Sequence, residues 1–344
     1  MTGKKKGVIM ELSRNHFNTG KEILYLTPLY INHNTGEVFC QEDIELEDGK
    51  RNWKARKRMS IQVAKLMKQY DKERANRIEQ CGTYLEFVKT PDQKNNLQRA
   101  NFCRERMCPM CQWRRSIKLG VQADEIYREL TERGYKHVFV TLTVKNVNAE
   151  KLIAAVDELI EAAQRFRRSK LYQGAFVGSY RALEITYNAR ENTYHPHLHY
   201  LMTVENDYFT SEKYVKQEDL IKAWKYAARL DYEPSVMIEA VRQKEGQSIT
   251  SACAEMCKYP VKSAEIKSSF VLENIDKALR GRRLIQWGGI AAQVRKEKNM
   301  DDIESGNLIN MSQEDLSGVP LEKVVYVWRY GLYVPIDIKE LKTN

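Results

Sequence analysis

The sequence has no long hydrophobic run and no apolar segment near its start. Within its 344 residues, no apolar stretch approaches the roughly 18 residues that a membrane-spanning helix requires. The polar start Met1–Lys6 lacks the adjacent apolar core of a secretion signal, so we expect a cytoplasmic protein with no membrane partner. Disulfides are rare in a reducing compartment, and the seven cysteines are therefore expected to be free thiols or metal ligands.

Acidic residues are scarce in one part of the chain, between Lys50 and Arg77, where two acidic side chains stand against eleven basic ones. The whole chain has a net charge of +10. Such an excess favours a nucleic-acid backbone as partner, although a solvated helix face explains a charge run about as often. Apolar residues recur at helical spacing in the same region, so the sequence predicts one amphipathic helix over residues 53–80 with a positive outer face.

Histidine is also rare, but three of the six histidines fall within five positions, at His195, His197 and His199. The alternation of polar and apolar residues around them predicts a β-strand, and side chains two apart on a strand point to the same face. A strand rises about 3.3 Å per residue, so one metal ion can contact two of these histidines but hardly all three. A single histidine on a half-buried strand is usually a satisfied polar residue, whereas three in alternation favour a metal site.

A carboxylate is expected to complete this site. Residues 177–187 are typical of a preceding strand, and the polar segment 189–194 is typical of a hairpin turn. With the turn centred between Glu191 and Asn192, Glu184 lies directly opposite His199 and shares its face. Two imidazoles and one carboxylate leave coordination positions open, which suits Mn²⁺ or Mg²⁺ better than a closed structural zinc site.

Four of the cysteines are spaced for a second metal. Cys108 and Cys111 form a Cys-x-x-Cys pair that can hold one zinc from a single turn, Cys103 lies within reach, and Cys81 can complete a tetrahedral Cys₄ site. We expect this zinc to be structural. Buried free thiols and a redox pair are the alternatives, and no thioredoxin-like strand precedes the pair.

The segment 248–262 offers a nucleophile. On a helix, Glu255, Tyr259 and Lys262 are spaced i, i+4 and i+7 and form one stripe. A phenolate can attack phosphorus and store the bond energy in a phosphotyrosine, and a carboxylate can activate water for a later hydrolysis. Two observations weigh against this interpretation: most of the nineteen tyrosines must be core or surface residues, and Pro260 disfavours helical geometry at Tyr259.

The remaining pattern predicts the fold class. Helical periodicity at residues 117–130, 152–166 and 211–229 alternates with strand-like segments at 136–144, 177–187, 195–202 and 235–241. From residue 136 the order is β-α-β-β-α-β, which predicts an α+β fold with an antiparallel, palm-like sheet and flanking helices. We expect three parts: a zinc-stapled, basic DNA-binding region at 1–113, a catalytic domain at 114–290 and a C-terminal segment at 291–344.

The histidine motif, His197-Leu198-His199 preceded by His195-Pro196, resembles that of HUH endonucleases, in particular the rolling-circle plasmid replication initiators with a single catalytic tyrosine. The Thr-Leu-Thr end of the 136–144 strand resembles their first motif, and Glu-x-x-x-Tyr-x-x-Lys resembles their third. Their cysteine region is similar to the Cys-Pro-x-Cys followed by Trp-Arg-Arg in this chain.

This resemblance implies a mechanism and partners. Tyr259 would nick one DNA strand at an origin and stay attached to its 5′ phosphate, Glu255 would support termination, and Lys262 would face the same DNA. The zinc region would present Arg104, Arg106, Arg114 and Arg115 to DNA. The expected partners are single-stranded or hairpin origin DNA, bound in a salt-sensitive manner, and the host helicase and DNA polymerase; the oligomeric state, a monomer or a dimer, stays open.

Two other functions fit parts of the sequence. The alternating histidines also match a histidine-triad nucleotide hydrolase, in which a histidine attacks a small nucleotide without a metal. A non-catalytic, zinc-dependent DNA-binding regulator explains the cysteines and the charge but leaves the histidines without a role. HUH relaxases and transposases are relatives of the favoured function and differ from it chiefly in DNA substrate.

Overall fold

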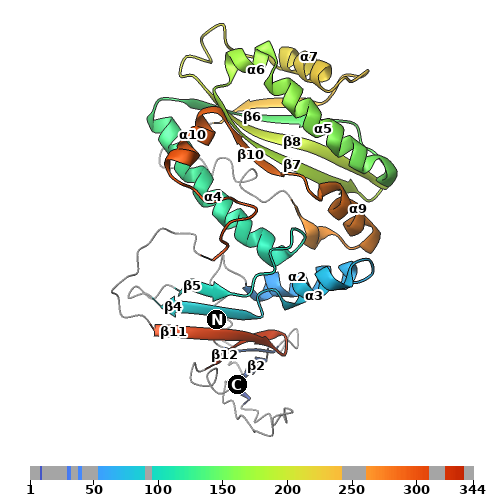
Figure 1. Cartoon of the computed structure of the whole chain (residues 1–344), viewed down its shortest axis with the longest axis vertical. Coiled ribbons are helices and arrows are strands. Elements are labelled where there is room, and N and C mark those ends of the chain that lie inside the picture. The colour runs from blue at the N-terminus through green and yellow to red at the C-terminus, as the bar shows by residue number, and fades with distance from the viewer. Residues whose placement is uncertain are drawn as a thin grey trace, which may run out of the picture.

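The computed structural model in Figure 1 describes residues 53–89, 95–241, 261–309 and 322–336. In the N-terminal part it also describes the backbone of three short strands, β1 (Val8–Ile9), β2 (Leu29–Ile31) and β3 (Val38–Cys40), which form an antiparallel sheet in that order. The predicted catalytic residues Glu255 and Tyr259 lie outside the described residues. No helix in the described ranges is long and apolar enough to cross a bilayer.

A five-stranded antiparallel sheet forms the centre of the fold. The strand order is β10-β7-β8-β6-β9. The strands are β6 (Lys136–Thr143), β7 (Gly178–Asn188), β8 (Thr193–Val204), β9 (Val236–Ala240) and β10 (Ile285–Gly288). The helices α5 (Leu152–Arg167) and α7 (Gln217–Ala227) connect them, so the predicted β-α-β-β-α-β order and the α+β class are confirmed. β10 is an additional edge strand that the sequence pattern did not reveal.

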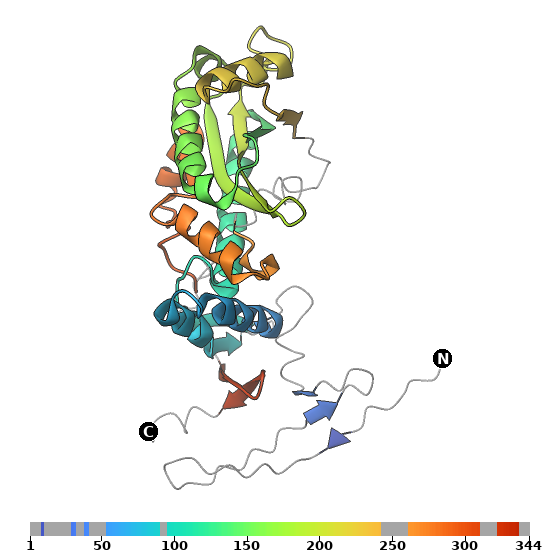
Figure 2. The same ribbon diagram turned by 90° about the vertical axis from the view of Figure 1, so that its right-hand side faces the viewer.

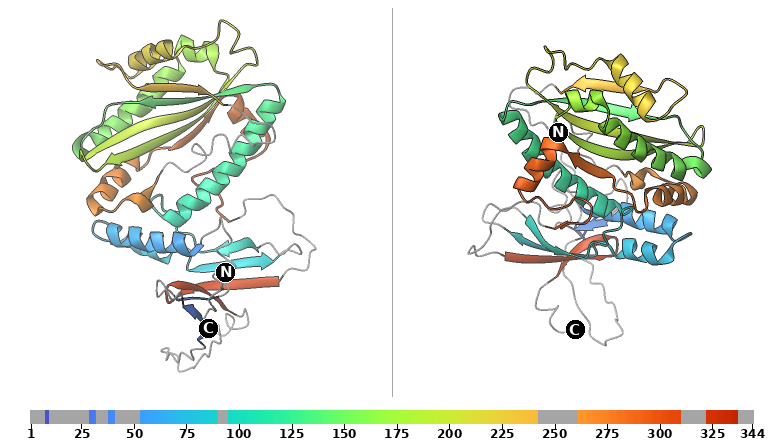
Figure 3. Two further views of the ribbon diagram at one scale, coloured as in Figure 1. Left: turned by 180° about the vertical axis from the view of Figure 1, so that it is seen from behind. Right: turned by 45° about the horizontal axis from the view of Figure 1, so that its top comes forward.

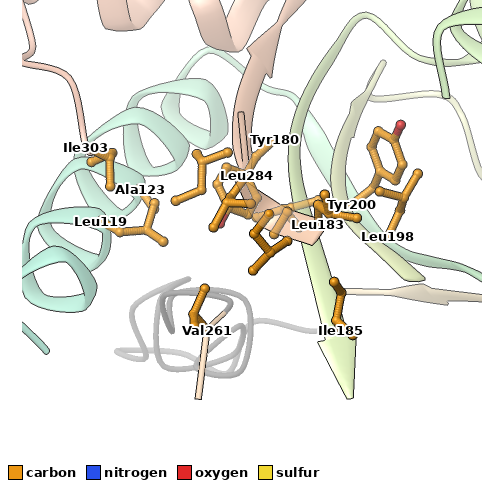
Figure 4. Close-up of a cluster of buried hydrophobic side chains, with 14 of the residues drawn as sticks. Leu119, Ala123, Tyr180, Leu183, Ile185, Leu198, Tyr200, Val261, Leu284 and Ile303 are labelled. Carbon is orange, nitrogen blue, oxygen red and sulfur yellow. The ribbon is translucent and has the colours of Figure 1, made fainter. Parts of the chain in front are cut away.

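Helices pack on both faces of this sheet. The helix α5, which follows the short turn η1 (Ala149–Lys151), lies on one face with α6 (Lys170–Ala175) and α7, as Figure 2 shows with the sheet seen from the side. The long helix α4 (Pro109–Glu132) packs on the other face, where the Tyr127 hydroxyl donates to the Leu201 carbonyl at 3.0 Å. Figure 4 shows Leu119 and Ala123 of α4 facing the buried side chains around Leu284.

A second sheet joins residues from both halves of the chain. Its antiparallel order is β12-β11-β4-β5, with β4 (Tyr84–Lys89), β5 (Asn95–Ala100), β11 (Glu322–Arg329) and β12 (Leu332–Ile336). The central pair places Val325 opposite Glu86. The strands after residue 291 therefore belong with the N-terminal region and do not form a separate segment, because β4 needs β11 to satisfy its backbone hydrogen bonds.

Helix α4 connects the four-stranded sheet to the five-stranded sheet, as Figure 3 shows from behind. We call the four-stranded sheet, together with the helices beside it, the lower layer. At the lower end lie α2 (Trp53–Met67) and α3 (Lys72–Gln80). The predicted single helix over residues 53–80 is thus two helices, because the Asp71 side chain caps α3 by accepting from the Arg74 amide at 3.1 Å. The predicted outer face is also not uniformly basic, since Lys54 and Lys57 are buried.

Three further elements complete the described chain. The short turn η2 (Ser263–Glu265) and α9 (Ser269–Leu279) lie beside the end of β7, and α9 packs against α5 and α2. After β10, α10 (Gly289–Glu297) packs against β7 and α4. The close approach at Gly289 needs glycine, because its φ is +57° and a Cβ there would lie 2.1 Å from the Val177 carbonyl oxygen.

Candidate functional site

The histidine hairpin is formed by β7 and β8, and its register differs from the predicted one. Glu184 lies opposite His197, and the residue opposite His199 is Ala182. The turn is one residue earlier than expected because the Asn188 side chain accepts from the Arg190 amide at 3.0 Å and starts the turn. Glu184 still shares a face with both histidines, since residues two apart on a strand point the same way.

Three ligand atoms converge on this face. The Nε2 atoms of His197 and His199 lie 3.0 Å apart, and Glu184 Oε2 lies 3.4 Å from His199 Nε2 and 3.7 Å from His197 Nε2. Metal–nitrogen bonds of about 2.1 Å at a right angle would place two nitrogens about 3.0 Å apart. The arrangement therefore fits a single divalent cation held by Glu184, His197 and His199.

Neighbouring groups fix both imidazoles in the orientation that a metal requires. The Nδ1–H of His197 donates to the His195 carbonyl at 3.0 Å, so its Nε2 keeps a lone pair. The Nδ1 of His199 lies 3.2 Å from the Thr141 hydroxyl, on the facing residue of β6. The Thr-Leu-Thr end of this strand therefore lies directly beside the histidines. His195 stacks on His197, with ring centroids 5.1 Å apart, and is not one of the three converging ligands.

The carboxylate of Glu184 is held in its charged form. Burial alone would raise the pKa of Glu184, but hydrogen bonds to His197, His199 and Lys262 outweigh it and keep the pKa well below its ordinary value. Lys262 Nζ lies 2.8 Å from Glu184 Oε1. The structure therefore brings together four of the predicted site residues, from strands β7 and β8 and from the chain just before η2. A pocket of about 480 Å³ opens beside Glu184 and Lys262.

The four predicted cysteine ligands also meet. Cys111 Sγ lies 3.6 Å from Cys81 Sγ and 3.7 Å from Cys103 Sγ, and all four sulfurs, with that of Cys108, lie within 4.8 Å of one another. Zinc–sulfur bonds of about 2.3 Å in a tetrahedron would separate the sulfurs by about 3.8 Å. Cys108 is the N-cap of α4 and Cys111 lies one turn later, so the partial positive charge of the helix N-terminus lies beside both sulfurs.

A buried lysine beside this cluster was missed by sequence reasoning. Lys57 is fully buried, and its ammonium donates to the Cys81 carbonyl at 2.7 Å and to the Glu79 carbonyl. Burial lowers the pKa of Lys57, while the negative charge of Cys81, Cys108 and Cys103 acts in the opposite direction. Nothing in the sequence distinguishes Lys57 from the other basic residues of its region. Its charge offsets part of the excess negative charge that four thiolates bring to a zinc ion.

The comparisons with known proteins agree with these sites. A family model described as "Replication protein" matches residues 94–332. The "Protein rep" of Streptococcus pneumoniae serotype 2 (strain D39 / NCTC 7466) is 34% identical over 301 residues, which cover 84% of this chain and 93% of that protein. The "Protein rep" of Bacillus amyloliquefaciens is 35% identical over 324 residues, covering 85% and 95%. No solved structure matches.

The chain belongs to the replication protein family. Residues 94–332 are more than half of its 344 residues, and the relatives are covered almost end to end. The predicted resemblance to plasmid Rep proteins is thereby confirmed, and the general function is that of a replication initiator.

Two of the four arginines that were predicted to bind DNA instead form hydrogen bonds within this replication protein. The guanidinium of Arg114 donates to the Leu308 and Ile309 carbonyls, both at 2.8 Å, and Arg115 donates to the Arg104 carbonyl at 2.7 Å. Both side chains are buried. We therefore assign them to the scaffold, in place of the DNA contact that the sequence predicted. They hold the loop after α10 against α4.

The other two predicted arginines lie nearer to the surface. Arg104 is exposed, and Arg106 is half-buried with its guanidinium on the Leu279 carbonyl. Both line a pocket of about 510 Å³, together with Arg74, Arg115 and Arg280. Asp276 and Glu105 hold the Arg74 guanidinium in this pocket, at 2.5 Å and 2.8 Å. Arg104 remains the best candidate of the four for contact with DNA.

Proposed function

We propose that this replication protein is a metal-dependent HUH endonuclease that nicks one strand of its origin DNA. Tyr259 attacks the scissile phosphodiester, the 5′ phosphate stays on the phenol oxygen, and the 3′ hydroxyl is released for a polymerase. The observation that carries the proposal is the convergence of Glu184, His197 and His199 with Lys262, which follows Tyr259 by three residues.

Lys262 relates the proposed nucleophile to the histidine cluster. Its ammonium pairs with Glu184, a member of that cluster. Three residues of extended chain span at most about 11 Å, so residues 259 and 262 are close enough in sequence to act at one phosphate. This supports Tyr259 over Tyr326, which also follows a glutamate, Glu322, by four residues and precedes a basic residue, Arg329, by three, because Lys262 pairs with Glu184.

A divalent cation, Mn²⁺ or Mg²⁺, would be held by His197, His199 and Glu184 and would polarise the scissile phosphate when bound. The protein contributes the geometry. The His195 carbonyl and the Thr141 hydroxyl hold the two imidazole rings so that both Nε2 atoms face the same point. The ionised carboxylate of Glu184 supplies the charge, and the open coordination positions leave room for phosphate oxygens.

The same residues support a return reaction. In strand transfer, a 3′ hydroxyl attacks the phosphotyrosine, the new phosphodiester bond forms, and the phenol of Tyr259 leaves. At termination, we propose that Glu255 takes a proton from a water molecule, which then attacks the phosphotyrosine and releases the tyrosine. The cycle thus uses one tyrosine for nicking and one carboxylate for hydrolysis.

Zinc bound to Cys81, Cys103, Cys108 and Cys111 is proposed as a structural element. The four sulfurs come from the end of α3, the loop after β5 and the first turn of α4, so one ion would join three parts of the lower layer. The proposed substrate is single-stranded or hairpin origin DNA in the cytoplasm, and the host helicase and polymerase would act on the released 3′ end.

A covalent-adduct assay tests the nucleophile. A labelled single-stranded origin oligonucleotide is incubated with Mn²⁺ and the wild-type chain, Tyr259→Phe or Tyr226→Phe, and adducts are resolved by denaturing electrophoresis. Tyr226 is 87% exposed on α7 and serves as the matched control. We expect adducts with the wild type and with Tyr226→Phe, and none with Tyr259→Phe, whose oligonucleotide binding should stay within a factor of two or so. An adduct with Tyr259→Phe refutes the proposed nucleophile.

A metal series tests the cation. Nicking by the wild type should require Mn²⁺ or Mg²⁺, and a His197→Ala, His199→Ala protein should lose this dependence along with its activity. If the double variant still nicks DNA and depends on the metal as the wild type does, the proposed metal site is wrong. DNA binding without any cleavage by the wild type would favour the zinc-dependent regulator instead.

A further inference from the structure

A buried arginine lies on the opposite face of the sheet from the histidines. Arg181 on β7 is only 6% exposed, and it points away from the Glu184 face because the two residues are three apart on one strand. One of its hydrogen bonds, from Nη2 to the Arg283 carbonyl at 3.4 Å, is long, and a second joins it to the Tyr200 side chain. Its Nε is buried without a hydrogen-bond partner among the residues that the structure describes.

The surroundings of Arg181 form a small polar cavity. A space of about 30 Å³ lies between the sheet and the helices α5 and α6, on the face that Figure 2 shows covered by these helices. Arg181 and Tyr200 lie at its buried side, and Arg167 and Gln164 of α5 are exposed at its outer side. Burial raises the pKa of Tyr200, while the charges of Arg181 and Arg167 and the hydrogen bond to Arg181 act in the opposite direction. Both guanidinium groups are therefore close to one phenol.

The cavity has two cations and no counter-charge. None of its lining residues is acidic. Within residues 53–89, 95–241, 261–309 and 322–336, neither Arg181 nor Arg167 forms an ion pair with a carboxylate. A buried charge that lacks a counter-charge is unfavourable, so a ligand or water that completes this arrangement would stabilise it.

Other buried cations of this chain are satisfied. Lys57 donates to two carbonyl oxygens, Arg114 donates to two more, and Lys118 lies 2.6 Å from Asp301 Oδ2. Each of these three cations thus has at least two close oxygen partners, whereas the buried Nε–H of Arg181 has none among the residues that the structure describes. Arg181 therefore differs from the buried basic residues whose hydrogen-bond donors are used to hold the fold together.

We propose that Arg181 and Arg167 form a binding site for a phosphate group, separate from the phosphate that the histidine cluster would process. The fork of a guanidinium group matches a tetrahedral oxyanion, and Arg181 has an unused Nε–H donor. The cavity holds a group of a few oxygen-sized atoms, and its outer side is open at Arg167. The phosphate belongs either to a DNA backbone that crosses this face or to a free phosphate or nucleotide.

Calorimetry with inorganic phosphate, on the full chain at constant ionic strength, tests the site itself. The variants are Arg181→Gln and Arg167→Gln, and the matched control is Arg168→Gln, an exposed neighbour outside the cavity. We expect the phosphate Kd to rise roughly tenfold to a hundredfold in the first two variants and to stay nearly unchanged in the third. Arg167 is exposed, so its variant should fold even if Arg181→Gln does not.

A second measurement identifies the source of the phosphate. The affinity of each variant for a single-stranded oligonucleotide is measured over a salt series. A slope of log K against log salt that is smaller by about one in Arg167→Gln than in Arg168→Gln assigns the site to the DNA backbone. Arginine-dependent phosphate binding with an unchanged slope assigns it to a free phosphate or nucleotide.

The proposal is overturned if the wild type binds no phosphate in a manner that depends on these arginines, because the cavity then holds only water. Equal loss of binding in Arg168→Gln would overturn it as well. Covalent-adduct formation through Tyr259 is measured in parallel, so that failure of the nicking proposal is recognised independently.

Discussion

The ammonium of Lys262 lies 2.8 Å from the Glu184 carboxylate, and this ion pair joins the chain that follows Tyr259 to the histidine strand. Lys262 is one of three groups that lower the pKa of Glu184 against the effect of burial. Two consequences follow for Lys262→Met. The nicking rate should fall about tenfold to a hundredfold, as is usual when a partner of a metal ligand is removed. The Mn²⁺ affinity should fall as well, because Glu184 then loses a group that helps to hold its carboxylate in the charged form.

The control for this prediction is Lys267→Met, an exposed lysine that lines the same pocket. It should leave both the rate and the Mn²⁺ affinity nearly unchanged. Rates are measured with the oligonucleotide at saturating Mn²⁺, and the affinity is measured by calorimetry. A Lys262→Met protein with the rate and the Mn²⁺ affinity of the wild type would show that the ion pair has no part in the reaction.

The hydroxyl of Thr141 orients His199, and its loss should weaken metal binding. In Thr141→Val the Nδ1 of His199 has no partner at 3.2 Å, so the ring is free to turn. We expect the Mn²⁺ affinity, measured by calorimetry on zinc-loaded protein, to fall about tenfold to a hundredfold. Thr203→Val, on the strand β8 that carries His199, is the control, because the Thr203 hydroxyl is buried without a partner among the described residues. Equal affinities in the two variants would contradict the assigned role of Thr141.

The cysteine cluster predicts one tightly bound zinc per chain. Cys111→Ser should lose this zinc and lower the melting temperature, whereas Cys40→Ser, at a cysteine outside the predicted set, should keep it. Lys57→Met should keep the zinc but bind it about tenfold to a hundredfold more weakly in a chelator competition, because an adjacent positive charge is lost. Absence of zinc from the purified wild type by elemental analysis would leave the cluster as a set of free thiols.

His137 predicts a pH-dependent stability. Burial lowers the pKa of His137 to about 4 from 6.5, and its ring packs edge-on to Tyr127 at 4.9 Å. Between these pH values the unfolded chain binds more protons than the folded chain, so stability is full above pH 6.5 and falls as the pH drops toward 4. The loss amounts to about 3 kcal/mol at most. Denaturant unfolding of His137→Leu should show a smaller loss over this range, and an identical loss would assign the effect to other groups.

The arginines on either side of the cysteine pair Cys108 and Cys111 should separate into two classes. Arg114→Gln should lower the free energy of unfolding by about 3 kcal/mol, because its buried guanidinium bonds two carbonyls and stacks near Trp53. Arg104→Gln should leave stability unchanged and reduce DNA affinity with a smaller salt dependence. Unfolding and oligonucleotide binding are measured on both. Unchanged stability in Arg114→Gln would restore it as a DNA-binding candidate.

Much of the site could be predicted because its parts lie close together in sequence or in repeating patterns. The two-residue period of a strand is enough to place His197 and His199 on one face, and a hairpin turn then brings Glu184 beside them. The error of one residue in the turn came from Asn188, whose side chain starts the turn earlier than composition suggests. Because Glu184 stayed on the same face, the predicted ligand set survived the error in register.

Features that depend on distant contacts could not be predicted in this way. The burial of Lys57, Arg114 and Arg115 results from carbonyl groups that other parts of the fold bring to them, and no local pattern among the 56 lysines and arginines shows which of them are buried. The same holds for β10, which is only four residues long and follows a basic, glycine-containing segment. The assignment of β11 to the N-terminal sheet was missed for the same reason.

The pairing of β4 with β11 has a consequence for synthesis of the chain. The ribosome makes β4 early, but the strand that covers its edge emerges only after the whole five-stranded sheet has been translated. A product that stops before residue 322 would carry an uncovered strand edge, which invites association with other chains. Translation that terminates early should therefore yield insoluble fragments in place of a partly active initiator, and only finished chains would reach an origin.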